Sequence, residues 1–223
     1  MFAKVICIEG HDRSGKATQS KAVADSLTSK GYKVSKFEIP FNDGLTYWVI
    51  YKMLSSNKIK KSPNLFQFFQ FLNKLFFQYT ALLWAKLTSD YVILDRWKLS
   101  AIIYGNASGS NKIFNQILYL LLTSVDYTIV MSGETFKRDE ALDAYESDND
   151  FQIQVKNGYK NWVMNNSVDH ALVTNKGTVE EVTKKIISHL NWVGITQNVD
   201  TSKFWWNSDT GEWEANQPNV EQK

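Results

Sequence analysis

Residues 5–16 read VICIEGHDRSGK, and they carry the clearest structural signal in the chain. Val5 to Glu9 form a short β-branched run typical of a strand, and Gly10 to Lys16 fit the pattern G-x-x-x-x-G-K. Lys16 to Ser29 then have the apolar periodicity of a helix. A strand, a glycine-bounded loop and a helix in this order predict a phosphate-binding loop, because backbone N–H groups and the positive end of the helix converge there.

The pattern also predicts which residues surround the phosphates. They are Gly10, His11, Asp12, Arg13, Ser14, Gly15, Lys16, Ala17 and Thr18. Lys16 is expected to reach the β- and γ-phosphates of a nucleoside triphosphate. Ala17 departs from the pattern, which places a Ser or Thr hydroxyl on Mg²⁺ at that position, and Thr18 lies about 100° further round the helix. A glycine turn that merely precedes a helix is the alternative interpretation.

Strands and helices alternate along the rest of the chain. Further strands are predicted at Lys33 to Ile39, Tyr91 to Leu94, Asp126 to Met131 and Ala171 to Thr174. Further helices are predicted at Leu45 to Ser55, Asn64 to Ser89, Lys112 to Leu122, Phe151 to Met164 and Thr178 to Leu190. This order predicts a three-layer α/β fold with a mostly parallel sheet flanked by helices. We expect one domain over residues 1–193 and an aromatic-rich tail over 194–223, which packs on the domain or meets another chain.

Composition excludes several classes of protein. The 223 residues carry a formal net charge of +2 with cations scattered among acids, so no nucleic-acid partner is expected. The single cysteine, Cys7, excludes a disulfide framework and favours a reducing, cytoplasmic compartment. The apolar stretch Leu65 to Leu87 carries the polar stripe Gln67, Gln70, Lys74 and Gln78, so a membrane span is not expected.

Glu9 to Gln19 resembles the opening of the thymidylate kinase family, E-G-x-D-x-x-G-K-[ST]-T-Q, and Arg13 inside the loop is similar to the eukaryotic and poxviral branch. The resemblance extends from about Lys4 to Leu190. It implies a P-loop nucleoside monophosphate kinase fold with a five-stranded sheet, ATP and Mg²⁺ as cofactors, a deoxynucleoside monophosphate as acceptor, and a homodimer.

Asp95-Arg96-Trp97 resembles the family motif D-R-[YFW]. An aspartate and an arginine at the carboxyl end of a strand lie where α/β sheets bind ligands, although a surface salt bridge is the simpler alternative. The resemblance implies that Lys16, Arg13, Asp95 and Arg96 are catalytic. It places Asp95 near the metal and Arg96 on the acceptor phosphate.

The resemblance also assigns a mobile lid and a donor-base site. The lid corresponds to about residues 133–150, where Arg138 would lie over the adenine of the donor and Tyr145 near the acceptor. Asn175 and Lys176 follow the last predicted strand, where the family contacts the donor base. Without the resemblance, residues 133–150 would be interpreted as a solvated charged loop.

The acceptor site is where the chain departs most from the family. The predicted acceptor-binding residues are Asp12, Phe41, Phe69, Gln70, Lys74, Arg96, Ser100, Tyr104 and Tyr145. Phe41 follows Pro40 as in the family's F-P turn, displaced by one residue, but the arginine that usually comes next is absent. Lys74 replaces a base-reading arginine, whose planar pair of donors a lysine does not reproduce. The polar stripe faces either the acceptor pocket or a subunit interface.

Three functions are consistent with these features. The first is a kinase for dTMP or a related or modified pyrimidine deoxynucleotide. The second is a nucleotide-binding protein with weak or no catalysis and a regulatory or structural role, which Ala17 and the absent phosphate-binding arginine favour. The third, a nucleoside or polynucleotide kinase, has the least support.

Overall fold

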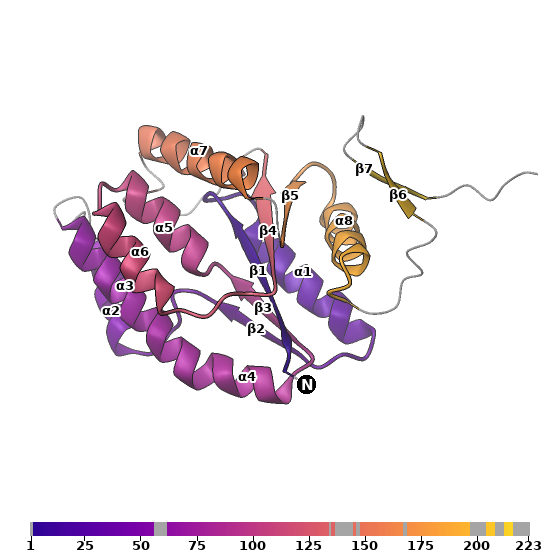
Figure 1. Ribbon diagram of the computed structural model, residues 1–223, viewed down its shortest axis with the longest axis horizontal. Coiled ribbons are helices and arrows are strands. Elements are labelled where there is room, and N and C mark those ends of the chain that lie inside the picture. The colour runs from indigo at the N-terminus through magenta and orange to yellow at the C-terminus, as the bar shows by residue number, and fades with distance from the viewer. Residues whose placement is uncertain are drawn as a thin grey trace, which may run out of the picture.

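The structure, a computed structural model, describes residues 2–55, 62–133, 135–136, 145, 148–166 and 169–196, and the backbone of 204–207 and 212–215. Its centre is a five-stranded parallel sheet in the order β2-β3-β1-β4-β5 (Figure 1). The strands are β1 (Lys4–Gly10), β2 (Val34–Glu38), β3 (Tyr91–Asp95), β4 (Tyr127–Ser132) and β5 (His170–Thr174). Because β1 lies between β3 and β4, the loop that follows it opens at the carboxyl edge where the strand order reverses.

Helices cover both faces of the sheet. They are α1 (Lys16–Ser29), α2 (Leu45–Ser55), α3 (Pro63–Phe77), the π-helical turn η2 (Gln78–Leu82), α4 (Leu83–Thr88), α5 (Lys98–Ala107), α6 (Lys112–Leu120), α7 (Asn149–Asn165) and α8 (Val179–Trp192). Figure 1 shows α1 and α8 on one side and the other helices on the opposite side. The predicted three-layer α/β fold is therefore confirmed.

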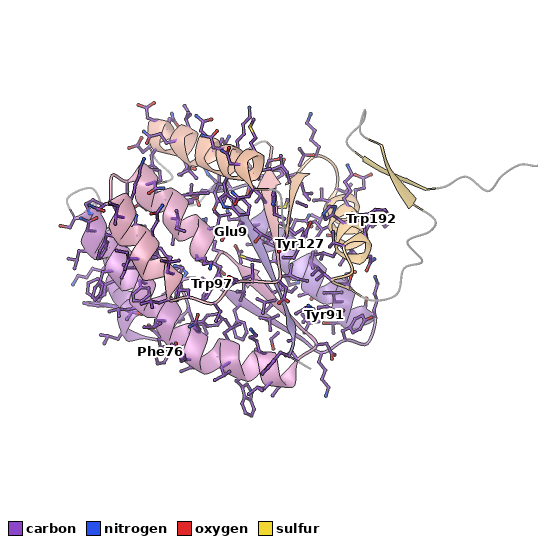
Figure 2. All side chains as sticks on the ribbon, viewed as in Figure 1. Glu9, Phe76, Tyr91, Trp97, Tyr127 and Trp192 are labelled. Atoms are coloured by element: carbon purple, nitrogen blue, oxygen red, sulfur yellow. The ribbon has the colours of Figure 1, made fainter. Side chains whose placement is uncertain are left out.

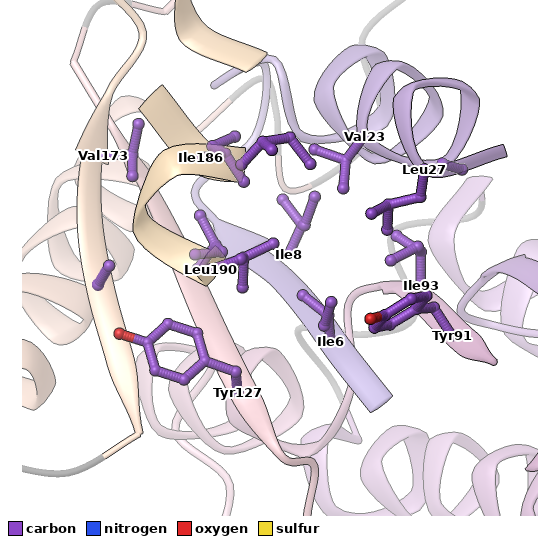
Figure 3. Packing of buried hydrophobic residues seen from close by; sticks show 14 of the residues in the cluster. Ile6, Ile8, Val23, Leu27, Tyr91, Ile93, Tyr127, Val173, Ile186 and Leu190 are labelled. Carbon is purple, nitrogen blue, oxygen red and sulfur yellow. The ribbon is translucent and has the colours of Figure 1, made fainter. Parts of the chain in front are cut away.

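The apolar core follows the alternation of side chains along the strands. Ile6 and Ile8 of β1 pack against Leu27 of α1 and Ile186 of α8 (Figure 3). Val5 and Cys7 point to the other face, where Phe77 and Trp97 fill the core. By the same alternation, the side chain of Glu9 lies on the same face of the sheet as that of Cys7, toward α5 and α7. A carboxylate is rarely buried in a protein core.

Most predicted elements are observed, but two differ. The predicted helix from Asn64 to Ser89 consists of α3, η2 and α4 in succession. Helix α5 (Lys98–Ala107) was not predicted at all. Its N-cap residue, Trp97, provides no capping side chain, so no local start signal marks this helix in the sequence.

The remaining chain-level expectations concern the tail and the membrane. Phe204–Asn207 (β6) and Glu212–Ala215 (β7) pair as an antiparallel ribbon. The division at residue 193, and the partner of the tail, stay predictions. Among the described helices, none combines the length and the apolar character that crossing a membrane requires.

Candidate active site

The loop after β1 has the backbone geometry that its glycines predict. Gly10 has φ 144°, and a Cβ at this position would lie 2.6 Å from the Met131 carbonyl oxygen, so only glycine fits. Gly15 has φ 85° and directly precedes α1. Arg13 also takes a left-handed conformation, with φ 58°. The loop therefore lies closely against β4 and places its backbone at the N-terminus of α1.

Lys16 is buried in this loop. Its Nζ donates a 2.6 Å hydrogen bond to the His11 carbonyl oxygen, within the loop itself. Burial, aided by the charge of Arg96, lowers the pKa of Lys16 to about 7, and Asp12 and Asp95 oppose this shift. A polyphosphate bound beside Lys16 would favour the charged form and so raise the pKa of its ammonium group again.

Asp12, Arg96 and Gln152 form a connected group beside the loop. Arg96 makes an ion pair with Asp12 Oδ1, and Gln152 Nε2 donates to Asp12 Oδ2 at 2.9 Å. Burial alone would raise the pKa of Asp12, but the charges of Arg96 and Lys16 and the Gln152 hydrogen bond outweigh it and hold this pKa below its usual range. The Arg96 guanidinium also lies 5.1 Å from the centre of the Tyr104 ring.

Asp95 ends β3 next to Arg96. Its side chain is buried, and Oδ1 has no hydrogen-bond partner among the described residues. Burial raises the pKa of Asp95, while Arg96 and Lys16 lower it. The part of the chain that the structure describes has no cluster of three acidic, His or Cys side chains that would hold a metal alone. One carboxylate oxygen without a partner still fits Mg²⁺, which takes one or two carboxylates together with water and substrate phosphates.

The acceptor-side cavity has a volume of about 200 Å³ and opens between the loop, α3 and α5. Its lining includes predicted residues, namely Asp12, Gln70, Lys74, Arg96, Ser100, Tyr104 and Tyr145. Tyr145 stacks on Phe151 with 4.2 Å between ring centres. The predicted Phe41 and Phe69 do not line this cavity, and Phe66 does. Phe66 lies one helical turn before Gln70, so the two side chains share the face of α3 that lines the cavity.

The polar stripe of α3 faces this cavity rather than the outside of the molecule. We call Gln67, Gln70 and Lys74 the polar wall, since all three line the cavity. Lys74 Nζ donates to Gln70 Oε1 at 2.9 Å, and Gln67 Oε1 accepts from the Tyr119 hydroxyl at 2.9 Å. Burial lowers the pKa of Lys74 to about 7; Glu9 opposes this shift and Arg96 adds to it. With both amide oxygens engaged, the polar wall has mainly N–H groups left for a ligand.

Phe41 is tied to α3 by its backbone, and its predicted acceptor-binding role stays a prediction. Its N–H donates to Asn73 Oδ1, and Asn73 Nδ2 donates to its carbonyl oxygen, both at 2.7 Å. Its ring lies 5.1 Å from that of Phe77. Phe41 therefore anchors the turn after β2 to α3. The side chain of Asn73 makes the pair of backbone hydrogen bonds with Phe41 that a neighbouring strand would make.

A second cavity, of about 290 Å³, lies on the other side of the loop. The predicted Arg13, Ser14, Gly15, Thr18 and Asn175 line it, as do the unpredicted Gln19 and Phe136. Asn175 Nδ2 donates to the Ser14 carbonyl oxygen at 3.3 Å, so β5 is tied to the loop. Lys176 and Ala17 are exposed and absent from the lining. Arg138 and most of the proposed lid lie outside the described residues.

Several residues that the structure brings to the site were not predicted as site residues. Phe66 and Phe136 line the two cavities, and Gln152 donates to Asp12 in the loop. Glu9 accepts a hydrogen bond from the Trp97 N–H, next to Arg96. Glu9 had a signal, because it is a charged residue inside an apolar strand. Phe66 and Phe136 had none, since aromatic residues are common in cores.

Comparison with known proteins agrees with this geometry. The thymidylate kinase family model matches residues 8–186. Thymidylate kinase from Candida albicans is similar in structure, with a TM-score of 0.73 and 21% identity over 89% of this chain and 96% of that one. Thymidylate kinase from Ehrlichia chaffeensis has a TM-score of 0.68 and 20% identity over 86% of this chain and all of that one. No curated protein sequence matches this one.

These structural likenesses support the fold alone, at so low an identity. The family match spans most of the chain and includes the phosphate loop, Asp95 and Arg96. The chain therefore belongs to the thymidylate kinase family and is an ATP-dependent nucleoside monophosphate kinase.

Proposed function

We propose that the protein transfers the γ-phosphoryl group of ATP to the 5′-phosphate of dTMP or a closely related pyrimidine deoxynucleotide. The observation that carries this proposal is the set of residues that line the acceptor-side cavity. Arg96 lines it beside the loop, and the polar wall lines it on α3. A nucleotide placed with its phosphate on Arg96 would present its base to the N–H groups of the polar wall, which suit keto oxygens.

Each polar group then has a role in positioning and neutralising charge. Lys16 would contact the β- and γ-phosphates, Arg13 would add charge as they transfer, and Arg96 would hold the acceptor phosphate. Asp12, held by Arg96 and Gln152, would fix the direction of the arginine. Phosphoryl transfer needs little beyond such positioning and electrostatic stabilisation.

We assign the metal position to Asp95. Mg²⁺, when bound, neutralises and orients the phosphates of ATP. Asp95 would hold it through Oδ1, with water and phosphate oxygens as the other ligands. Ala17 supplies no hydroxyl, so this chain would bind the ion through fewer side chains than the usual motif does.

A panel of acceptors tests the proposal. With ATP·Mg²⁺ and release of ADP as the readout, we expect kcat/KM for dTMP and dUMP to exceed that for dCMP and dAMP by about 10²-fold, since an amino group opposite the polar wall leaves donors unpaired. If none of the monophosphates led to release of ADP, the result would instead support the non-catalytic alternative. Phosphorylation of thymidine but not dTMP would support a nucleoside kinase.

Lys74→Arg provides a matched variant for the same panel. In the wild type, the preference for keto bases should weaken as pH rises through about 7, because the charged form of Lys74 is lost there. The arginine variant stays charged and should keep its preference up to pH 8.5. Identical pH profiles of the two proteins would show that Lys74 does not read the base.

We also propose a homodimer formed through the outer side of the helix that runs from α3 to α4. Apolar side chains there are exposed at helical spacing: Leu65, Phe68, Phe76, Tyr79, Leu83 and Leu87. Phe76, labelled in Figure 2, is half exposed on this face. Helix α6 packs beside α3 and adds exposed Ile117 and Leu120. A patch of this extent is typical of a protein interface.

Phe76→Glu should therefore convert the dimer to a monomer. Light scattering after gel filtration should give twice the 25.7 kDa chain mass for the wild type and the single mass for the variant. Ile153→Glu on α7, at 56% exposure against 50% for Phe76, is the matched control and should remain dimeric. A monomeric wild type at micromolar concentration would refute the dimer.

A cytoplasmic location is the last part of the proposal. It is supported by the one cysteine, Cys7, which is buried and reduced among the core residues of β1. Fractionation of cells that produce the protein would test it, and recovery from a secreted fraction would contradict it.

A further inference from the structure

Glu9 lies at a junction of three elements. Its carboxylate is fully buried, and Oε1 accepts hydrogen bonds from the backbone N–H of Trp97 at 2.8 Å and of Ser100 at 3.2 Å. Oε2 accepts from the Tyr159 hydroxyl at 3.0 Å. Glu9 belongs to β1, the two N–H groups to the start of α5, and Tyr159 to α7. Figure 2 shows Glu9 and Trp97 in the interior, between the sheet and α5.

The carboxylate serves as the cap of α5. The first N–H groups of a helix have no partner within it, and Trp97 offers no capping side chain. A negative group at this positive helix end is favourable. Glu9, from a distant strand, therefore accepts the hydrogen bonds of the first N–H groups, which a Ser or Asp at the N-cap would normally accept. Burial, aided by Glu9, raises the pKa of Tyr159 well above its ordinary value, so its hydroxyl stays a donor.

This junction holds the backbone on both sides of Arg96. Arg96 N–H donates to the Ile8 carbonyl oxygen at 3.0 Å, and the next N–H, of Trp97, donates to Glu9. Arg96 has φ 70°, a left-handed conformation that is strained for a residue with a side chain. The flanking hydrogen bonds therefore keep Arg96 turned toward Asp12.

Helix α7 reaches the site at two points. Tyr159 and Gln152 lie two helical turns apart and so share a face, with Tyr159 on Glu9 and Gln152 on Asp12. Gly158 packs so closely on α5 that a Cβ there would lie 2.8 Å from Ile103. The register of α7 against β1 thus depends on the Tyr159 hydrogen bond, while the position of Asp12 depends on Gln152.

We infer that Glu9 and Tyr159 are positioning residues for phosphoryl transfer, which set α7 so that Gln152 holds Asp12 and Arg96 in the transfer geometry. This inference rests on the proposed kinase function. Neither residue lines the two cavities beside the loop. Their effect is on the orientation of Arg96, and misplacing such a group by about 1 Å costs up to about 10²-fold in rate.

Tyr159→Phe tests the inference, with Tyr127→Phe as its control. Tyr127 is also buried in the core, and its hydroxyl is 2.6 Å from His189 Nε2, far from the loop. We expect Tyr159→Phe to lower kcat for dTMP about 10-fold, with KM for ATP within about twofold of the wild type. Tyr127→Phe should keep the wild-type kcat at a comparable loss of Tm. Wild-type kcat in Tyr159→Phe would overturn the inference, as would equal loss of kcat in both variants.

A double-mutant cycle separates positioning from general destabilisation. If Tyr159 acts through Gln152, then adding Gln152→Leu to Tyr159→Phe should lower kcat far less than Gln152→Leu does alone. Additive effects would show that the two residues act independently and would refute the coupling. Should Tyr159→Phe fail to fold, Glu9→Gln provides the same cycle. An inactive wild type refutes the kinase function itself, whereas an active wild type with an unaffected variant refutes only the positioning role.

Discussion

Replacement of Lys16 by methionine is expected to lower kcat for phosphoryl transfer by about 10³-fold while leaving the fold intact. The ammonium group is the only part of the side chain that phosphates need, and removing a group that stabilises transition-state charge costs about this much. Methionine keeps the length of the side chain and its packing. Because burial already disfavours the charge of Lys16, the variant loses little stability.

The measurement is single-turnover formation of dTDP from ATP and dTMP, with circular dichroism as the test of folding. Lys21→Met on the same helix is the control. Lys21 is exposed and forms only a surface pair with Asp25, so its rate should equal that of the wild type. Full activity of Lys16→Met would show that the loop takes no part in the reaction and would refute the proposed function.

Asp95→Asn is expected to change activity and stability in opposite directions. The amide has the shape of the carboxylate but only weakly binds Mg²⁺, so kcat should fall by about 10²-fold at saturating metal. The buried carboxylate has an oxygen without a partner among the described residues, and burial raises its pKa. Removing the charge should therefore raise Tm by a few degrees at pH 7.

The sign of the pH dependence follows from the same shift. Because the folded-state pKa of Asp95 lies above the ordinary value of 3.8, the folded protein binds the proton more tightly than the unfolded chain does. Between these two values the contribution of Asp95 to stability falls as pH rises, and above both the penalty is constant. Asp95→Asn should lack this dependence, so its gain in Tm over the wild type should vanish at pH 3.

Asp126→Asn is a control for which we expect the opposite pattern of stability and activity. Asp126 Oδ1 pairs with Lys4 at 3.1 Å and Oδ2 accepts from Val5 N–H at 2.9 Å, at the end of the sheet away from the loop. This variant should lose stability and keep its rate. If Asp95→Asn instead destabilised the protein without affecting kcat, Asp95 would be a structural residue and the metal assignment would be wrong.

Residues close together in the sequence could be predicted, and residues joined only by the fold could not. The loop from Gly10 to Lys16 was predictable because its strand, glycines and helix are contiguous. The position of Asp95 and Arg96 beside the loop was predictable because the carboxyl ends of parallel strands meet at one edge of the sheet. The phenylalanine of α3 that lines the acceptor-side cavity was not predictable, since Phe66 and Phe69 look alike until the neighbours of α3 define its inner face.

The α/β class, the phosphate loop and the family were predictable, since each depends on periodicity or on a motif that is continuous along the chain. The way the site is held together became visible in the folded protein. Contacts between distant segments cap α5 with Glu9 from β1, place Gln152 on Asp12, and tie the Phe41 backbone to Asn73 of α3. The physical reason is that buried polar groups must find partners, and after folding those partners come from segments far apart in the chain.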